Sequence, residues 1–250
     1  SPIVSAFAIM FLYLSSVKLI MSYRGKIRSQ IDSLIVFGSS LVGSLTFAFT
    51  DSHWFNAVEA EVYGFSTFFT AIVVWLILHW SEKADESGNE RYILIIAYMI
   101  GLATGVHLLN LLALPFLALI IFFRKYDFSY KGFAITTAIT GIVFYLINTG
   151  IINGMPKLVS IIGLPALMMI YLLIFGSMVA SIIYKKYLYA LGLTSTVLII
   201  IGYSSYAMIF IRSDQKPAIN ENDPSTVSRA IAYMEREQYG RMFQFPRRYT

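Results

Sequence analysis

The chain has 250 residues, of which 57% are hydrophobic and only 13% are charged. Soluble domains carry about 25% charged residues, so this composition excludes an ordinary soluble globular protein and indicates a helical protein that crosses a membrane several times. The net charge of +5 fits basic loops on the cytoplasmic side of such a protein, and we therefore predict no nucleic-acid partner.

Apolar runs long enough to cross a bilayer recur along the chain. The simple membrane segments are expected at Ile3–Met21, Ile31–Phe49, Tyr63–Trp80, Phe133–Ile147, Leu158–Tyr184 and Leu188–Ile211. One further stretch, Tyr92–Phe123, has 32 residues, which is too long for one ordinary span at about 1.5 Å per residue. Its middle reads GLATGVHLLNLLALP, where glycine, proline and polar residues interrupt the apolar pattern.

The charges of the loops indicate that Tyr92–Phe123 is a hairpin that turns near Val106–Asn110. With that turn, the loops on one side hold eleven basic residues, and those on the other side hold only Lys157. The eleven are Lys18, Arg24, Lys26, Arg28, Lys83, Arg91, Arg124, Lys125, Lys131, Lys185 and Lys186. A single long helix would divide the charges as seven against five, and basic residues concentrate on the cytoplasmic side of membrane proteins.

We therefore predict an all-α, polytopic transmembrane bundle with about eight membrane segments, including this short re-entrant-like hairpin. Residues 1–212 form the transmembrane domain. Residues 213–250 are polar and are interpreted as an extracytoplasmic linker or the start of a soluble domain.

The segment DSHWFNAVEAEVYG, residues 51–64, concentrates acid between two apolar runs. On the predicted topology it lies on the non-cytoplasmic side, together with His107 and Asn110 at the hairpin tip. Two helices of about 15 residues reach only about 22 Å, so the tip should lie below the membrane surface. Irregular polar backbone at that depth is tolerated only against protein or water, and we predict a polar cavity open to the outside.

If residues 52–65 are one helix, two stripes of side chains result. The first holds Ser52, Asn56, Glu59 and Tyr63, and the second holds Trp54, Val58, Glu61 and Phe65. Glu61 is the lone ionisable residue on an apolar stripe, and such a group needs a partner or a substrate. The alternatives are that the carboxylates are solvated loop residues and that His107 only packs between helices. No tight spacing supports a divalent cation, and we predict no metal site.

Four segments together resemble a large bacterial membrane family whose animal relative is an endoplasmic-reticulum protein O-mannosyltransferase. They are HWFNAVEAEVYG (53–64), GLATGVHLLNLLALP (101–115), INENDPS (219–225) and MEREQYG (234–240). The family is similar to the GT-C superfamily of multi-spanning glycosyltransferases, and the resemblance runs over essentially the whole chain.

The resemblance implies an enzyme of the bacterial inner membrane that works at the periplasmic face. It would move mannose or a similar sugar from a polyprenyl-phosphate carrier to Ser or Thr of exported proteins, without a further cofactor. A carboxylate would act as general base on the acceptor hydroxyl, and polar groups would steady the leaving phosphate. Carried over to this chain, the catalytic candidates are Glu59 and Glu61, and the substrate-binding candidates are Asp51, Asn56, Tyr63, His107 and Asn110.

The chain also departs from the family pattern. Members normally begin with another helix and an outer loop that bears an acidic residue, followed by a proline-rich stretch, and none of this precedes Ser1. We therefore expect a fragment that lacks the principal acid of the GT-C pattern. Two other functions stay open: a transporter with a broken hairpin at mid-membrane and a non-catalytic subunit of a larger membrane assembly. No inverted repeat relates the two halves, which counts against a transporter.

Overall fold

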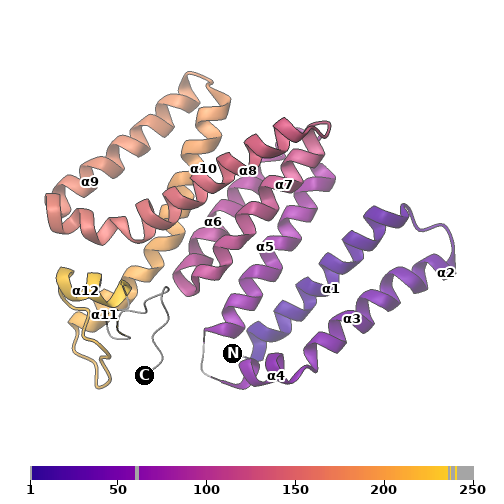
Figure 1. Ribbon diagram of the computed structural model, residues 1–250, viewed down its shortest axis with the longest axis horizontal. Helices are drawn as coiled ribbons and strands as arrows, with labels where there is room; N and C mark the ends of the chain where they lie inside the picture. The colour runs from indigo at the N-terminus through magenta and orange to yellow at the C-terminus, as the bar shows by residue number, and fades with distance from the viewer. Residues whose placement is uncertain (1, 60–61, 236, 238–239, 241–250) are drawn as a thin grey trace.

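The computed structural model describes residues 2–59, 62–235, 237 and 240, and the regular elements in these ranges are helices. Helix α1 (Pro2–Arg24) runs from the lower to the upper end of the molecule in Figure 1. The chain then returns through α2 (Gln30–Ser33), a π-helical stretch η1 (Leu34–Gly38) and α3 (Ser39–Ala48), which follow one another as a single apolar rod.

At the lower end the chain forms the short helix α4 (Asp51–Val58). Helix α5 (Tyr63–Lys83) then rises along α1, and α6 (Glu90–Val106) descends beside α5 (Figure 1). The 3₁₀ segment η2 (Leu108–Leu112) reverses the chain, and α7 (Ala113–Lys125) rises again.

The return of α7 to the upper end is fixed by contacts with the end of α5. The Nε atom of Arg124 donates to the carbonyl of Ser81 over 3.0 Å, and its guanidinium pairs with Asp85. Ser81 and Asp85 lie just before α6 begins. The end of α7 therefore lies close to the start of α6, and the two helices form a hairpin. The hairpin predicted from the loop charges is therefore confirmed, with its turn between Val106 and Ala113.

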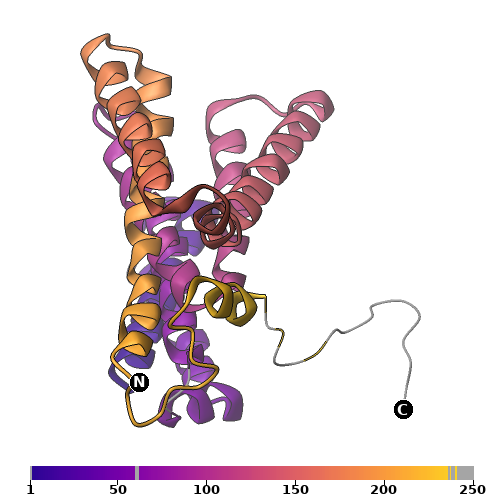
Figure 2. The same ribbon diagram turned by 90° about the vertical axis from the view of Figure 1, so that its left-hand side faces the viewer.

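The second half of the chain forms two further pairs of helices. Helix α8 (Tyr130–Tyr145) descends into a π-helical stretch η3 (Leu146–Ile152), and α9 (Gly154–Ile183) returns to the upper end. Helix α10 (Tyr187–Tyr203) descends again beside α6. Figure 2 shows the α7–α8 pair leaning away from the α9–α10 pair toward the upper end.

Helix α9 contains the span predicted at Leu158–Tyr184, but it is not straight. Gly163 has φ 80° and ψ 160°, which divides α9 into a first part that runs across the bundle and a second part that rises (Figure 1). Pro165 follows two residues later, where it supplies no N–H to the helix. The positive φ suits glycine, so the sequence Gly-Leu-Pro bends the helix here.

The last described elements return to the lower end. A single turn η4 (Ser204–Tyr206) leads into α11 (Ala207–Asp214), and a loop then carries the chain to α12 (Val227–Met234). Helix α12 packs beneath the crossing part of α9, and Met234 lies against the central core. The described part of the predicted linker is thus folded onto the bundle, while the division at residue 212 stays a prediction.

Seven helices in the described ranges are long and apolar enough to cross a bilayer, and α6 adds a shorter arm of 17 residues. The all-helical polytopic bundle is confirmed, and the chain is an integral membrane protein whose partner is the lipid bilayer. The buried core lies where α5, α6 and α10 meet, around Ile77, Ile96, Ile100 and Ile199.

Helices α6 and α10 approach each other through two glycines. A Cβ added to Gly202 would lie 2.6 Å from the carbonyl oxygen of Tyr98 and 2.7 Å from the backbone nitrogen of Leu102. A Cβ added to Gly101 would lie 2.9 Å from the Cα of Ile199. Small residues allow such close approach of membrane helices, and this crossing sets the separation of the ends of α6 and α10.

Candidate functional site

A cavity of about 820 Å³ opens at the lower end of the molecule, where the ends of α5, α6 and α10 face the folded-back tail. This is the end opposite the basic loops. Its walls come from the start of α5, the end of α6 with the hairpin turn, the end of η3, the end of α10 with α11, and the tail. The lining residues are Val62, Tyr63, Phe65, Thr104, Gly105, Val106, His107, Leu108, Ile152, Asn153, Tyr203, Tyr206, Ile209, Glu221, Asn222, Tyr233 and Met234. The volume is typical of small-molecule pockets.

His107 stands at the point where α6 stops. Its backbone is extended, with φ −156° and ψ 128°, and the chain leaves the helix there. Its ring Nδ1 accepts a hydrogen bond from the backbone N–H of Leu109 over 3.3 Å. A neutral imidazole that accepts at Nδ1 carries its proton on Nε2, so Nε2–H is available as a donor. The ring of Tyr63 lies 5.9 Å away, centroid to centroid, and both side chains line the cavity.

Asn110 lies under the same turn and is 4% exposed. Its Oδ1 accepts hydrogen bonds from the hydroxyls of Thr70 at 2.7 Å and Ser66 at 3.3 Å. Its Nδ2 donates to the carbonyl of Ala103 over 3.0 Å. The amide therefore ties the hairpin turn to both α5 and α6, and it holds His107 at the cavity indirectly. A direct contact of Asn110 with a substrate stays a prediction.

The tail is ordered around one carboxylate, Asp223. Its oxygens accept hydrogen bonds from the Ser225 hydroxyl at 2.8 Å and the Asn220 amide at 2.9 Å, and they pair with Arg229. The hydrogen bond from Ser225 and the charge of Arg229 hold the pKa of Asp223 below its ordinary value. This arrangement presents the preceding residues, Glu221 and Asn222, to the cavity.

A second attachment fixes the end of α12. Glu235 forms an ion pair with Lys157 at the start of α9, between side chains that are 39% and 50% exposed. Because Tyr233 and Met234 precede Glu235 and line the cavity, the pair holds one wall against the bundle. The tail therefore closes one side of the cavity.

The acid-rich segment 51–64 borders the cavity without forming one helix, so the expectation for residues 52–65 is wrong. Glu59 is extended, with φ −75° and ψ 153°, and ends α4, whereas α5 begins only at Tyr63. Helix α4 packs the ring of His53 against Phe47 of α3 and also contacts α1 and α5, whereas α5 runs along α1. The two predicted stripes therefore do not share a helix.

The remaining candidates of this segment do not line the cavity in the part of the chain that the structure describes. Asp51 is exposed at the first turn of α4, where its charge suits the positive end of the helix. Asn56 is half-buried in α4, and Glu59 is half-buried at its end. Glu61 lies outside the described residues. The contribution of these four residues to a site stays a prediction.

One family model matches residues 1–130, more than half of the chain, and describes the N-terminal domain of the protein O-mannosyl-transferase TMEM260. The chain belongs to this family. Membership makes it a protein O-mannosyltransferase-like glycosyltransferase. No curated protein and no solved structure matches it. The region matched to TMEM260 contains α1 to α7 and hence Tyr63 and His107, whereas the opposite wall of the cavity lies beyond it.

In this TMEM260 relative, the residues of the opposite wall were not among the candidates predicted from sequence. Glu221 and Asn222 stand within INENDPS, a segment singled out for its resemblance and not for chemistry, so that segment was the available signal. Tyr203 and Tyr206 stack at 5.6 Å on the last turns before α11, and nothing in the sequence separates them from membrane-interface tyrosines. Within the described ranges, no three His, Asp or Glu side chains gather as a metal site.

Proposed function

We propose that this chain carries the sugar-transfer site of a membrane O-glycosyltransferase. The donor is mannose or a similar sugar on a polyprenyl phosphate, and the acceptor is a Ser or Thr hydroxyl of an exported protein. The reaction takes place in the cavity between the hairpin turn and the tail, on the non-cytoplasmic side of what we take to be a bacterial inner membrane.

The observation that carries this proposal is the cavity itself, in a chain of the O-mannosyltransferase family. It brings an imidazole, tyrosines and a carboxylate from distant segments to one end of an apolar bundle, where a lipid-linked donor could enter from the bilayer. The end that holds the cavity is opposite the end with the basic loops, and the positive-inside rule supports a non-cytoplasmic position for it.

The chemistry requires one base and one group that receives negative charge. The acceptor oxygen forms a bond to the anomeric carbon of the sugar while the bond from that carbon to the phosphate oxygen breaks. The phosphate leaves with the bonding electron pair, and the hydroxyl proton passes to a carboxylate.

The carboxylate candidates are Glu221, which lines the cavity, and Glu59 and Glu61, which come just before the lining residue Val62 in the sequence. The Nε2–H of His107 is suited to donate to a phosphate oxygen as charge develops there, and Tyr63 stands beside it. Asp51, Asn56 and Asn110 are proposed to support the binding of substrate at or near this end.

The test is transfer of radiolabelled sugar from polyprenyl phosphate to acceptor protein by the intact gene product in membranes. Loss of a general base typically costs about 10²–10⁴-fold in rate, and one of Glu221→Gln, Glu59→Gln and Glu61→Gln should show this loss. His107→Ala should lower the rate by about 10²–10³-fold, and His107→Gln should restore part of it because the amide also donates.

Asp214→Asn is the matched control, because Asp214 at the end of α11 is an exposed acid at the same end that does not line the cavity. It should leave the rate nearly unchanged. Equal rates for the wild type and for all three glutamate variants would refute a catalytic carboxylate in this chain. Movement of a solute across the membrane without sugar transfer would overturn the proposed function in favour of a transporter.

A further inference from the structure

A second cavity lies at the opposite, basic end of the molecule, in the loop that joins α1 to α2. It measures about 270 Å³ and is lined by Arg24 to Arg28, Asp32 and Val36. Nothing in the proposed sugar transfer uses it. Three of its residues are cations and one is a carboxylate, so its formal charge is 3 − 1 = +2. The site therefore favours an anion.

The carboxylate of Asp32 holds the residues around the cavity together by hydrogen bonds. Its Oδ1 accepts a hydrogen bond from the Arg24 guanidinium over 3.1 Å, and its Oδ2 accepts from the Ser29 hydroxyl at 2.9 Å and from the backbone N–H of Arg28 at 3.3 Å. Both carboxylate oxygens thus accept hydrogen bonds from residues of the loop region, and one of these bonds positions Arg24. The cavity keeps a fixed guanidinium whose remaining N–H groups are free for a second acceptor.

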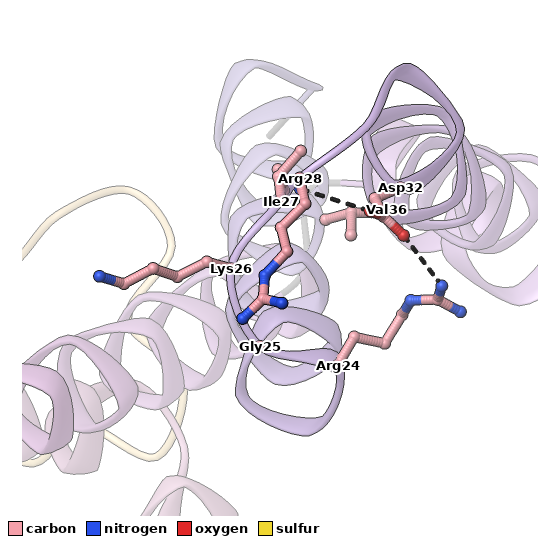
Figure 3. A pocket seen from close by; sticks show the side chains of 7 residues that line it. All are labelled: Arg24, Gly25, Lys26, Ile27, Arg28, Asp32 and Val36. Carbon is pink, nitrogen blue, oxygen red and sulfur yellow. Dashed lines mark hydrogen bonds and ion pairs between the residues drawn. The ribbon is translucent and has the colours of Figure 1, made fainter.

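Figure 3 shows Arg24 directed toward Asp32, the side chain of Arg28 beside the same loop, and Lys26 pointing away from both arginines. In the described part of the chain, neither Lys26 nor Arg28 takes part in an ion pair. Two arginines that line one small cavity suit a phosphate, which arginine binds in a bidentate manner. Because the formal charge of the site is +2, binding of a phosphodiester with one negative charge would not make the site negative.

The surroundings of the cavity indicate that this phosphate carries an apolar tail. Helix α3 packs mainly against α1 at the edge of the bundle, and α2 contacts η1, so the rod of α2, η1 and α3 faces lipid on its other sides. The side chains of Tyr23, Ile31 and Leu34, next to the cavity residues in the sequence, are 93%, 70% and 73% exposed. The cavity thus stands where a helix pair leaves the apolar layer, at the level of phospholipid headgroups.

We propose that the α1–α2 loop binds the headgroup of one anionic phospholipid, with Arg24 and Arg28 on its phosphate and its acyl chains along the exposed side of α2 and α3. The site is separate from the sugar-transfer cavity, and the proposal does not depend on the proposed function. A free phosphate ion shares the headgroup chemistry, and the experiment distinguishes the two.

The experiment titrates the delipidated full chain, in a non-ionic detergent, with phosphatidylglycerol, and native mass spectrometry counts the bound lipid. Each arginine that donates hydrogen bonds to the lipid phosphate contributes about a 5-fold gain in affinity. Arg24→Gln with Arg28→Gln should therefore bind about 25-fold more weakly. The matched control is Lys185→Gln with Lys186→Gln, which removes the same charge from an exposed loop at the same end, and it should change affinity by less than about 2-fold.

Helicity by circular dichroism is measured for every variant. If the double variant loses helix, Arg28→Gln alone decides the question, because it leaves the Arg24–Asp32 bond intact and should still weaken binding about 5-fold. Equal weakening by the loop control would overturn the proposal and assign the effect to general surface charge. Displacement of the lipid by an equal concentration of inorganic phosphate, or equally tight binding of phosphatidylcholine, would also overturn it.

Discussion

Replacing Gly202 by alanine should force α6 and α10 apart. The new Cβ would meet the Tyr98 oxygen at 2.6 Å and the Leu102 nitrogen at 2.7 Å, and ordinary contacts begin near 3.4 Å. The helices must therefore separate by about 3.4 − 2.6 = 0.8 Å, because both obstacles are backbone atoms that cannot rotate away. Overpacking of this kind costs about 1–3 kcal/mol, which for a chain of this size lowers the melting temperature by roughly 2–12 °C.

The assay is thermal unfolding of the purified protein in detergent, followed by intrinsic fluorescence. The matched control is Gly192→Ala on the same helix, where an added Cβ meets no heavy atom within 4 Å. That control should be neutral or should gain about 0.5–1 kcal/mol. The same melting temperature for Gly202→Ala and Gly192→Ala would refute the close approach of α6 and α10.

Three further outcomes are expected. Asn110→Ala should destabilise the protein by about 1–3 kcal/mol, measured by the same melting assay, because the buried partners of the amide lose their hydrogen bonds; an unchanged melting temperature would contradict this. The pKa of Asp223 is held below its ordinary value of 3.8, so its stabilisation is complete above that pH and is lost as the pH falls through the lowered pKa. Limited proteolysis of residues 215–226 should therefore accelerate in strong acid, and Asp223→Asn should be cleaved quickly at every pH. A double-mutant cycle on Lys157 and Glu235 should give about 0.2–1 kcal/mol at low salt and nearly nothing at high salt, and a value that salt does not change would argue against the exposed pair.

The hairpin of α6 and α7 was predictable because the evidence for it is a property of the whole chain. Eleven basic residues fall on one side only if the chain turns near His107, and the distribution of loop charge does not depend on local helix propensity. The structure places Arg124 beside Ser81, as that count requires. Composition and charge therefore sufficed for the class of fold and for the turn that carries His107.

One local expectation was wrong, and one confirmed span has a bend that was not foreseen. The segment around Glu59 reads as a continuous helix by periodicity, yet the extended backbone of Glu59 ends α4, and α5 begins only at Tyr63. Helix α9 bends at Gly163 just before Pro165, a signal that apolar run length alone ignores. In both places tertiary packing or a single backbone angle decides the outcome, and neither is visible in an average over a window of residues.

The cavity itself was predicted as an outward-facing polar space, but only its near wall could be assigned. Tyr63 and His107 line it, and both were candidates. Glu221 reaches it because Asp223 and Arg229 fold the tail back. That contact links residues far from the hairpin, and no periodicity in the tail reports where it will dock.

The walls of the cavity also set an order of events during synthesis. Residues 104–108 leave the ribosome well before α10, and residues 221–234 follow later still. A nascent chain that has reached α8 therefore exposes the hairpin turn and the bare face of Gly101 with no partner to cover them. Domains assemble as their parts are translated, so the cavity is closed on its tail side only after residues 221–234 have been made. Ribosome-stalled intermediates should carry the basic loop of α1 and α2 complete while the opposite end is still open.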